Sequence, residues 1–200
     1  IASCDRRKIL NEVSPAADLA HFVASYTILS EVQSGESIAL NDGVPTIVVL
    51  SSDKSVATFT TKQNTRSVKG AWFCGQYIKN SRISIADDVE YLVIIRLQPT
   101  ILKYITTQTT QYFRGRPAFE LQYLFGEQTD KLLESFSSAK QPASIIKSFE
   151  RFVRRYYVKA VWRNSLLEES VDFIRFEKGN LEIQYVAKKL KVSYKWLERN

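Results

Sequence analysis

The chain has 200 residues, of which 44% are hydrophobic, and this is enough apolar material for a soluble protein with a sizeable buried core. Its formal net charge is +7, with 28 lysines and arginines against 21 acidic residues. One histidine and two cysteines argue against the usual metal sites, and no apolar run approaches the roughly 20 residues that span a bilayer.

Residues from about 18 to 98 alternate short apolar segments with turn signals. Residues 18–24 predict a short helix or a lead-in before the first strand. Segments rich in β-branched and aromatic residues predict strands at 46–51, 55–61, 71–78, 82–85 and 91–97. The Asn-Asp-Gly of 41–43 and the polar residues 51–54 supply turns between them. This spacing predicts a compact antiparallel sandwich or barrel.

From Pro99 the apolar residues change to helical spacing, in 101–105, 119–125 and 132–136. The segment 143–157 predicts an amphipathic helix. Its apolar face holds Ile145 or Ile146, Phe149, Phe152 or Val153, and Tyr156, and its basic face holds Arg151, Arg154 and Arg155. Three roles stay open for this helix: packing on the sheet domain, pairing with a second copy, or connecting to the C-terminal module.

A first C-terminal helix is predicted from Leu167, Val171 and Ile174, and Gly179 stands where a helix C-cap prefers glycine. A second helix begins near Leu181. Its packed face consists of Ile183, Val186, Ala187 and Leu190, while Lys188 and Lys189 project outward.

The residues after this helix predict a tight turn and a third helix. Val192 fills the turn, and Lys191 must adopt a positive φ at a position often held by glycine. Ser193 is expected to cap the next helix, whose Leu197 points back into the core. A helix, a tight turn and a second helix are typical of a helix-turn-helix DNA reader.

Charge is concentrated in the same region. Residues 146–200 carry 13 lysines and arginines against 7 acidic residues, whereas residues 1–145 carry 15 against 14. Such a basic region favours contact with the phosphate backbone of nucleic acids. A solvated basic helix surface is the alternative, and the coinciding helix-turn-helix pattern favours DNA.

Residues 181–199 resemble the first helix-turn-helix of AraC/XylS-type transcriptional regulators, in which an alanine, a hydrophobic-serine turn and a leucine-x-arginine recur at these spacings. Residues 40–46, 73–76 and 93–99 resemble the sensor domain that precedes this module in one branch of the family. The resemblance covers nearly the whole chain. Lys191 departs from the glycine often found in the turn, and the second helix-turn-helix of the family is absent.

We therefore expect an α+β fold. Residues 1–160 form a sensor or dimerisation domain, β-rich to about 98 and helical from about 99, and residues 161–200 form the first part of an all-α helix-turn-helix module. The resemblance implies a bacterial, non-enzymatic regulator that binds a double-stranded DNA operator without a cofactor. A small-molecule effector and a homodimer are consistent with it.

The candidate DNA contacts lie at the start and end of the third C-terminal helix. Tyr194 and Lys195 are predicted to contact bases or backbone, Arg199 a phosphate or a guanine, and Ser193 a phosphate in addition to its capping role. Core packing is the alternative for Tyr194 and the favoured role for Trp196. A salt bridge to an acidic neighbour is the alternative for Arg199.

A ligand pocket in the first domain is a further hypothesis. Five aromatic residues could line it, although at strand spacing they are first of all core residues: Tyr26, Phe59, Trp72, Tyr77 and Tyr91. A small-molecule-binding or protein-interaction module without specific DNA binding is the alternative function for the whole chain.

An enzyme or a metal-binding barrel is the rival class. His21 is the only histidine and lies among apolar residues, where a packed or surface role is favoured over catalysis. Asp87 and Asp88 mark a turn rather than a catalytic carboxylate pair, because adjacent residues of a strand point to opposite faces.

The sequence also predicts the compartment. We expect Cys4 and Cys74 to be two unrelated thiols rather than a disulfide, as in a cytoplasmic protein. Because the sequence begins at Ile1 and has no methionine, we expect a fragment that is cut at both ends.

Overall fold

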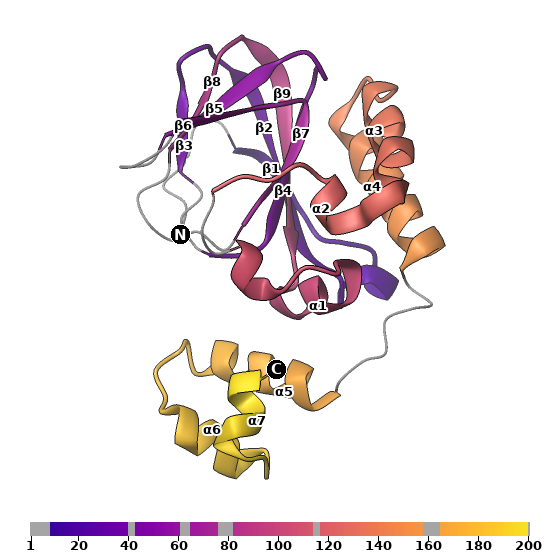
Figure 1. Cartoon of the computed structure of the whole chain (residues 1–200). Helices are drawn as coiled ribbons and strands as arrows, with labels where there is room; N and C mark the ends of the chain where they lie inside the picture. The colour runs from indigo at the N-terminus through magenta and orange to yellow at the C-terminus, as the bar shows by residue number, and fades with distance from the viewer. Residues whose placement is uncertain are drawn as a thin grey trace. The chain divides into compact units, whose positions relative to one another are not determined.

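A computed structural model describes residues 9–39, 43–60, 65–75, 82–113, 117–157 and 165–199. The chain divides into two compact units, Ile1–Ala160 and Val161–Asn200. The predicted α+β class is confirmed, with two antiparallel sheets and helices in the first unit and helices alone in residues 165–199 of the second (Figure 1).

The strands of the first unit form two antiparallel sheets that make a small barrel. One sheet has the order β1-β2-β9-β4-β7, and the other has the order β3-β8-β5-β6. Their bounds are Ile9–Val13 (β1), Val23–Val32 (β2), Ser37–Ala39 (β3), Thr46–Leu50 (β4), Val56–Thr60 (β5), Thr65–Lys69 (β6), Ala71–Cys74 (β7), Arg82–Ile85 (β8) and Val89–Leu97 (β9).

The core of the barrel lies between the two sheets. Strand β4 is buried over its whole length and β9 over most of it. The four-stranded sheet covers one face of these strands, and α4 packs against β9. The rings of Phe59 and Trp72 meet edge to face at 5.7 Å between centroids inside this core. Cys74 is buried there too, and Cys4 lies outside the described residues.

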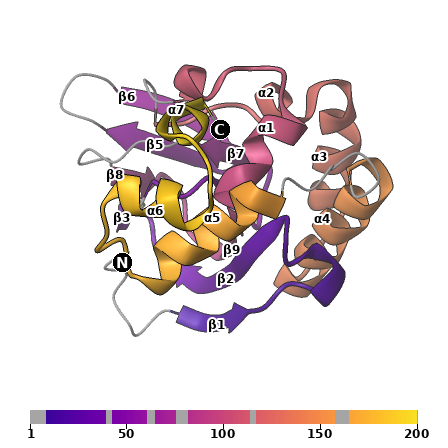
Figure 2. The same cartoon turned by 90° about the horizontal axis from the view of Figure 1, so that it is seen from below.

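Helices follow the barrel, as the change of period at Pro99 predicts. Their bounds are Leu102–Ile105 (α1), Gln122–Phe125 (α2), Thr129–Ser137 (α3) and Pro142–Tyr156 (α4), with 3₁₀ turns at Ala17–Leu19 (η1), Pro99–Ile101 (η2), Thr110–Phe113 (η3) and Gly126–Gln128 (η4). Both views place α3 and α4 next to each other along one side of the barrel (Figures 1 and 2).

Helix α4 packs within its own unit. Pro142 starts the helix at a position where its missing N–H costs nothing. The buried face contacts α3 and β9, and its aromatic residues join a cluster with Phe22 and Phe125. This packing confirms the first of the three roles, packing on the sheet domain, and the predicted face is right except that Tyr156 is only half-buried.

An ionic network joins α4 to η1 and to Tyr26 of β2. The guanidinium of Arg154 donates to both carboxylate oxygens of Asp18, at 2.7 and 3.0 Å. Glu150 accepts hydrogen bonds from the backbone N–H of Ala16 at 3.2 Å and from the hydroxyl of Tyr26 at 3.4 Å. The hydrogen bond from Arg154 lowers the pKa of Asp18, and burial followed by the charge of Glu150 raises the pKa of Tyr26.

The second unit consists of Ser165–Phe176 (α5), Ile183–Lys189 (α6) and Tyr194–Arg199 (α7). Helix α5 ends in a turn in which the N–H of Gly179 donates to the carbonyl of Ile174 at 2.8 Å. Lys178, with φ of 54°, holds the left-handed position after the helix, and Gly179 follows with φ of 73°. The helix therefore ends one residue earlier than predicted, with Lys178 rather than Gly179 at the first left-handed position.

The packed face of α6 is shorter than the sequence predicts. Val186, Ala187 and Leu190 are buried, but Ile183 is 41% exposed, so its assignment to that face is wrong. Ile183 is the first residue of the helix, and the buried contact is made only by the second half of α6.

Candidate nucleic-acid interface and candidate pocket

The turn between α6 and α7 has a defined hydrogen-bond pattern. The N–H of Val192 donates to the carbonyl of Ala187 at 3.0 Å, and the N–H of Lys191 donates to the carbonyl of Lys188 at 3.3 Å. Lys191 lies between them with φ of 55°, as the sequence predicts. These two bonds around a left-handed residue make a Schellman motif, which fixes the direction in which the chain leaves α6.

Helix α7 begins with the predicted cap. The hydroxyl oxygen of Ser193 accepts a hydrogen bond from the backbone N–H of Trp196 at 3.1 Å. This satisfies one of the N–H groups that a helix start leaves without an intrahelical partner. The capping role of Ser193 is confirmed, and it sets the register in which Tyr194 and Lys195 are the first two residues of the helix.

Both residues at the start of α7 are available at the surface. Tyr194 is 47% exposed and Lys195 is exposed, whereas Trp196 and Leu197 are half-buried. Tyr194 therefore does not take the core role that is its alternative. The backbone of Arg199 ends α7, but its side chain lies outside the described residues, so its predicted contact stays a prediction.

Exposed cations gather on α6, the turn and α7. The exposed lysines of this stretch are Lys188, Lys189, Lys191 and Lys195. Helix α5 instead carries Glu168, Glu169 and Asp172 on its described surface. Among the side chains of this unit that the structure describes, these four exposed lysines thus lie on α6, on α7 and in the turn between them.

Aromatic contacts hold part of this basic surface in place. The rings of Phe173 and Tyr185 lie 5.8 Å apart between centroids, and the Nζ of Lys189 lies 5.7 Å from the Phe173 ring. A lysine held over a ring can still present its ammonium group to solvent. Lys188 and Lys189 have the outward position that the sequence predicts.

The described aromatic residues proposed for a ligand pocket do not line one pocket. Tyr26, Phe59 and Tyr91 are buried, with the hydroxyl of Tyr26 on Glu150 and the hydroxyl of Tyr91 donating to the carbonyl of Ala139 at 3.3 Å. Tyr77 lies outside the described residues. Tyr26, Phe59 and Tyr91 therefore pack in the core of the first unit. Trp72 is the one residue of these four that lines the pocket presented in the next paragraph.

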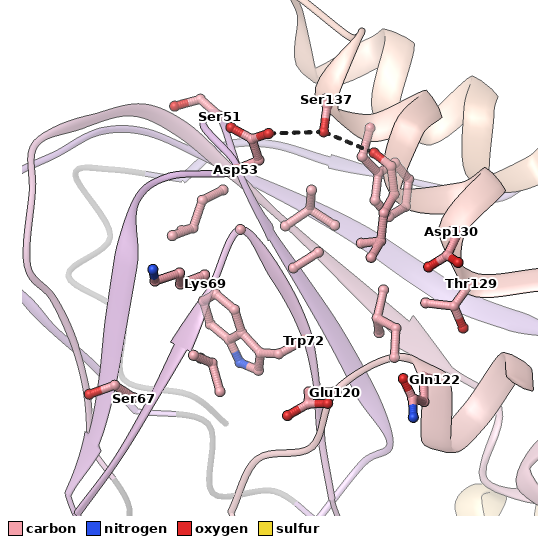
Figure 3. Close-up of a pocket in the computed structure, with 18 residues that line it drawn as sticks. Ser51, Asp53, Ser67, Lys69, Trp72, Glu120, Gln122, Thr129, Asp130 and Ser137 are labelled. Atoms are coloured by element: carbon pink, nitrogen blue, oxygen red, sulfur yellow. Dashed lines mark hydrogen bonds between the residues drawn. The ribbon is translucent and has the colours of Figure 1, made fainter.

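That pocket is a cavity of about 580 Å³ between the β6–β7 corner and the segment that includes α2 and α3 (Figure 3). Its polar and charged lining residues are Ser51, Asp53, Ser67, Lys69, Glu120, Gln122, Thr129, Asp130 and Ser137. They come from distant parts of the chain, so no sequence spacing could have brought them to attention. The pocket lies wholly within the first unit.

The corner at Gly70 shapes one wall of the pocket. Its N–H donates to the carbonyl of Ser55 at 3.1 Å, and its carbonyl accepts from the N–H of Leu50 at 2.8 Å. With φ of +58°, a Cβ at this position would lie 2.9 Å from the Cα of Asp53. Only glycine allows the two backbone segments to approach so closely.

The described part of the chain has neither a cluster of metal ligands nor a membrane-spanning helix. In that part, no three His, Cys, Asp or Glu side chains gather in a group that could hold a metal ion. Across the same residues, none of the helices combines the length and the apolar character needed to cross a membrane.

Comparison with known proteins gives structural neighbours only. No family profile matches the sequence, and no curated protein matches it. Similar solved structures include the AraC-like transcriptional activator CuxR, with 12% identity and a TM-score of 0.39 over 85% of this chain and 68% of that one. CuxR belongs by its description to the family that the sequence resembles.

Two other solved structures match with similar scores. Wild-type ToxT from Vibrio cholerae, bound to an unsaturated fatty acid, has 10% identity and a TM-score of 0.44 over 87% of this chain and 71% of that one. A Cupin 2 conserved barrel domain protein from Salinispora arenicola has 12% identity and a TM-score of 0.32 over 52% of this chain and 92% of that one.

Proposed function

We propose that this chain is a cytoplasmic, sequence-specific DNA-binding transcriptional regulator of AraC type, in which α7 reads an operator in the major groove. The first unit would bind an effector or hold a homodimer. No catalytic role is assigned, since a single histidine leaves little for acid–base or metal chemistry.

The observation that carries the proposal is the geometry around Lys191 and Ser193. A Schellman turn ends α6 and a serine cap begins α7 three residues later. Both devices orient α7 through the backbone, so the exposed side chains of its first turn extend from a rigid base. In helix-turn-helix proteins, residues in the first turn of the second helix contact base edges.

The chemistry of the exposed residues suits a DNA groove. Lys195 can donate to guanine O6 and N7 or to a phosphate, and Tyr194 can donate through its hydroxyl or pack on a thymine methyl group. The oxygen of Ser193 accepts from Trp196, which leaves the hydroxyl proton to donate to a phosphate. The lysines of α6 and the turn would add phosphate contacts.

A binding assay tests these roles separately. A duplex selected from a random library by the full-length protein would be titrated with wild type and with Lys195→Ala. Loss of one base-contacting side chain is expected to weaken binding by about 1–3 kcal/mol and to relax preference at one base pair. Lys131→Ala is the matched control, since Lys131 is an exposed lysine of α3 in the first unit.

The same assay tests the alternative of a module without specific DNA binding. Retention that falls with salt while no sequence is enriched would leave only a basic surface. Equal losses from Lys195→Ala and Lys131→Ala would also contradict the role of α7.

A further inference from the structure

The pocket of the first unit contains two buried polar atoms without partners. In the described part of the chain, the indole Nε1 of Trp72 and the hydroxyl Oγ1 of Thr129 make no hydrogen bond. Trp72 is 0% exposed and Thr129 is 4% exposed, and both line this one cavity. Because roughly nine in ten buried polar groups of folded proteins are paired, two unpaired groups at the same cavity indicate a bound molecule that completes them.

The two atoms define what such a molecule must offer. An indole N–H is only a donor, so the molecule needs an acceptor at Trp72, whereas a hydroxyl both donates and accepts. The ring of Trp72 is fixed by its edge-to-face contact with Phe59 at 5.7 Å between centroids. A fixed donor selects for the position of the acceptor, because the ring cannot turn to follow a ligand.

The charged residues of the lining restrict the ligand further. The lining contains three acidic residues, Asp53, Glu120 and Asp130, and one basic residue, Lys69. It therefore carries more negative than positive charge. Arg66 lies 3.7 Å from Glu120 and offsets part of this excess. A negatively charged ligand would be repelled by the remaining carboxylates.

Apolar side chains supply most of the other contacts. They come from both walls: Val49, Leu50, Val68, Ala71, Leu121, Leu133 and Phe136. A cavity of about 580 Å³ is of the size that holds a small organic molecule. The nitrogen of Trp72 is covered, and the long side chains of Lys69 and Glu120 lie beside the ring in Figure 3. Rotation of these side chains would let an acceptor reach the indole.

We propose that this pocket binds a small, mostly apolar molecule that carries a hydrogen-bond acceptor and no negative charge. Trp72 donates to the acceptor, and Thr129 holds a second polar group on the opposite wall. Binding of this ligand is a property of the first unit and does not depend on the DNA-binding role proposed for the second.

Three probes with the same ring body separate the chemical requirements. Naphthamide is uncharged, its aminoethyl amide is cationic, and naphthoate is anionic, while all three carry an acceptor oxygen. The full chain has three tryptophans, so its nitrogen–proton NMR spectrum has three indole signals, and Trp72→Phe identifies the one from the pocket. Each probe is titrated while that signal is followed. Binding to the variants, including Trp72→Phe, which lacks this signal, is measured by isothermal titration calorimetry with wild type in parallel.

The two amides are expected to shift the Trp72 signal, and naphthoate is expected to bind about tenfold more weakly because of the carboxylates. Trp72→Phe, which keeps an aromatic ring, should weaken naphthamide binding by about tenfold through the loss of one hydrogen bond. Thr129→Val removes the second unpaired polar group, the Thr129 hydroxyl, at nearly constant shape and should also weaken binding. Trp196→Phe, in the second unit, is the control and should leave binding unchanged.

Three results would overturn the proposal: no probe shifts the Trp72 signal up to its solubility, naphthoate binds as well as the amides, or neither pocket variant weakens binding. Each variant is first compared with wild type by its NMR spectrum, so that a loss of fold is not read as a loss of the site. DNA binding is measured in a separate assay, so either claim can fail alone.

Discussion

Replacing Gly70 by alanine should destabilise the first unit strongly. The backbone of Gly70 has φ of +58°, a left-handed conformation that costs an L-residue about 1–2 kcal/mol. The new Cβ would also lie 2.9 Å from the Cα of Asp53, closer than real Cβ contacts. Because that neighbour is backbone, relief requires a shift of the 53–55 turn, with an overpacking cost of about 1–3 kcal/mol.

Gly35 provides the matched control. Its φ is +78°, but nothing lies within 4 Å of its Cβ position. Gly35→Ala therefore carries the left-handed cost without the steric one. We expect Gly70→Ala to lower the free energy of unfolding by about 2–5 kcal/mol and Gly35→Ala by about 1 kcal/mol.

Urea unfolding measures the difference. Since the chain has two units, the first is followed through Trp72 fluorescence with Trp162→Phe and Trp196→Phe in all variants, which gives one transition for one unit. The midpoint of Gly70→Ala should lie about 1 M urea below that of Gly35→Ala. Equal midpoints for the two variants would refute the close approach of Gly70 to Asp53 as the reason for glycine at this corner.

Three other predictions concern the turn, the cap and the ionic network. Ser193→Ala should lower the stability of the second unit by about 1 kcal/mol in urea unfolding, while Ser193→Asp, which can still accept from Trp196, should retain most of it; a neutral Ser193→Ala would contradict the cap. Lys191→Gly should raise the stability of that unit by about 0.5–1 kcal/mol, because glycine adopts the φ of 55° without strain, and a loss of stability would argue against the Schellman turn. The pKa of Asp18 is lowered by Arg154, so the stabilisation from this pair is present above the ordinary pKa of an aspartate and is lost as pH falls through the lowered value. Asp18→Asn should therefore lower the melting temperature at neutral pH and leave it unchanged in strong acid, and an equal loss at both pH values would exclude the ion pair as its cause.

The sequence predicted those elements whose signals are local. The turn at Lys191, the cap at Ser193 and the amphipathic helix that became α4 depend on residues within a few positions of one another, and all three are confirmed. Strands β4, β5, β7, β8 and β9 were also expected, because runs of β-branched and aromatic residues mark them.

Other strands gave weaker signals. Strand β2, Val23–Val32, mixes apolar residues with Ser25, Ser30 and Glu31, and was anticipated only as a lead-in at residues 18–24. Its position beside β9 is fixed by eight paired residues that are far away in sequence. The short strands β3 and β6 likewise depend on partners, β8 and β5, rather than on their own composition.

Of the pocket lining, only Trp72 could be predicted from the sequence. Trp72 was among the candidates, but Thr129 and Glu120 come from segments about 50 residues later in the chain and have no pattern of their own. Tyr26, Phe59 and Tyr91 were grouped with Trp72 as aromatic residues of a β-rich zone, but they are buried without lining the pocket, although Phe59 contacts the Trp72 ring. Chemical type alone does not tell which side of a barrel wall a residue faces.

The most direct test of the central claim is a change of base preference caused by one side chain of α7. Operator selection from a random duplex library at about 150 mM salt would be carried out in parallel with wild type, Tyr194→Ala and Lys195→Ala. If α7 reads DNA, each substitution relaxes the preference at a different base pair and leaves the rest of the selected sequence intact. Identical selected sequences for all three proteins, bound with equal affinity, would show that α7 does not read the operator.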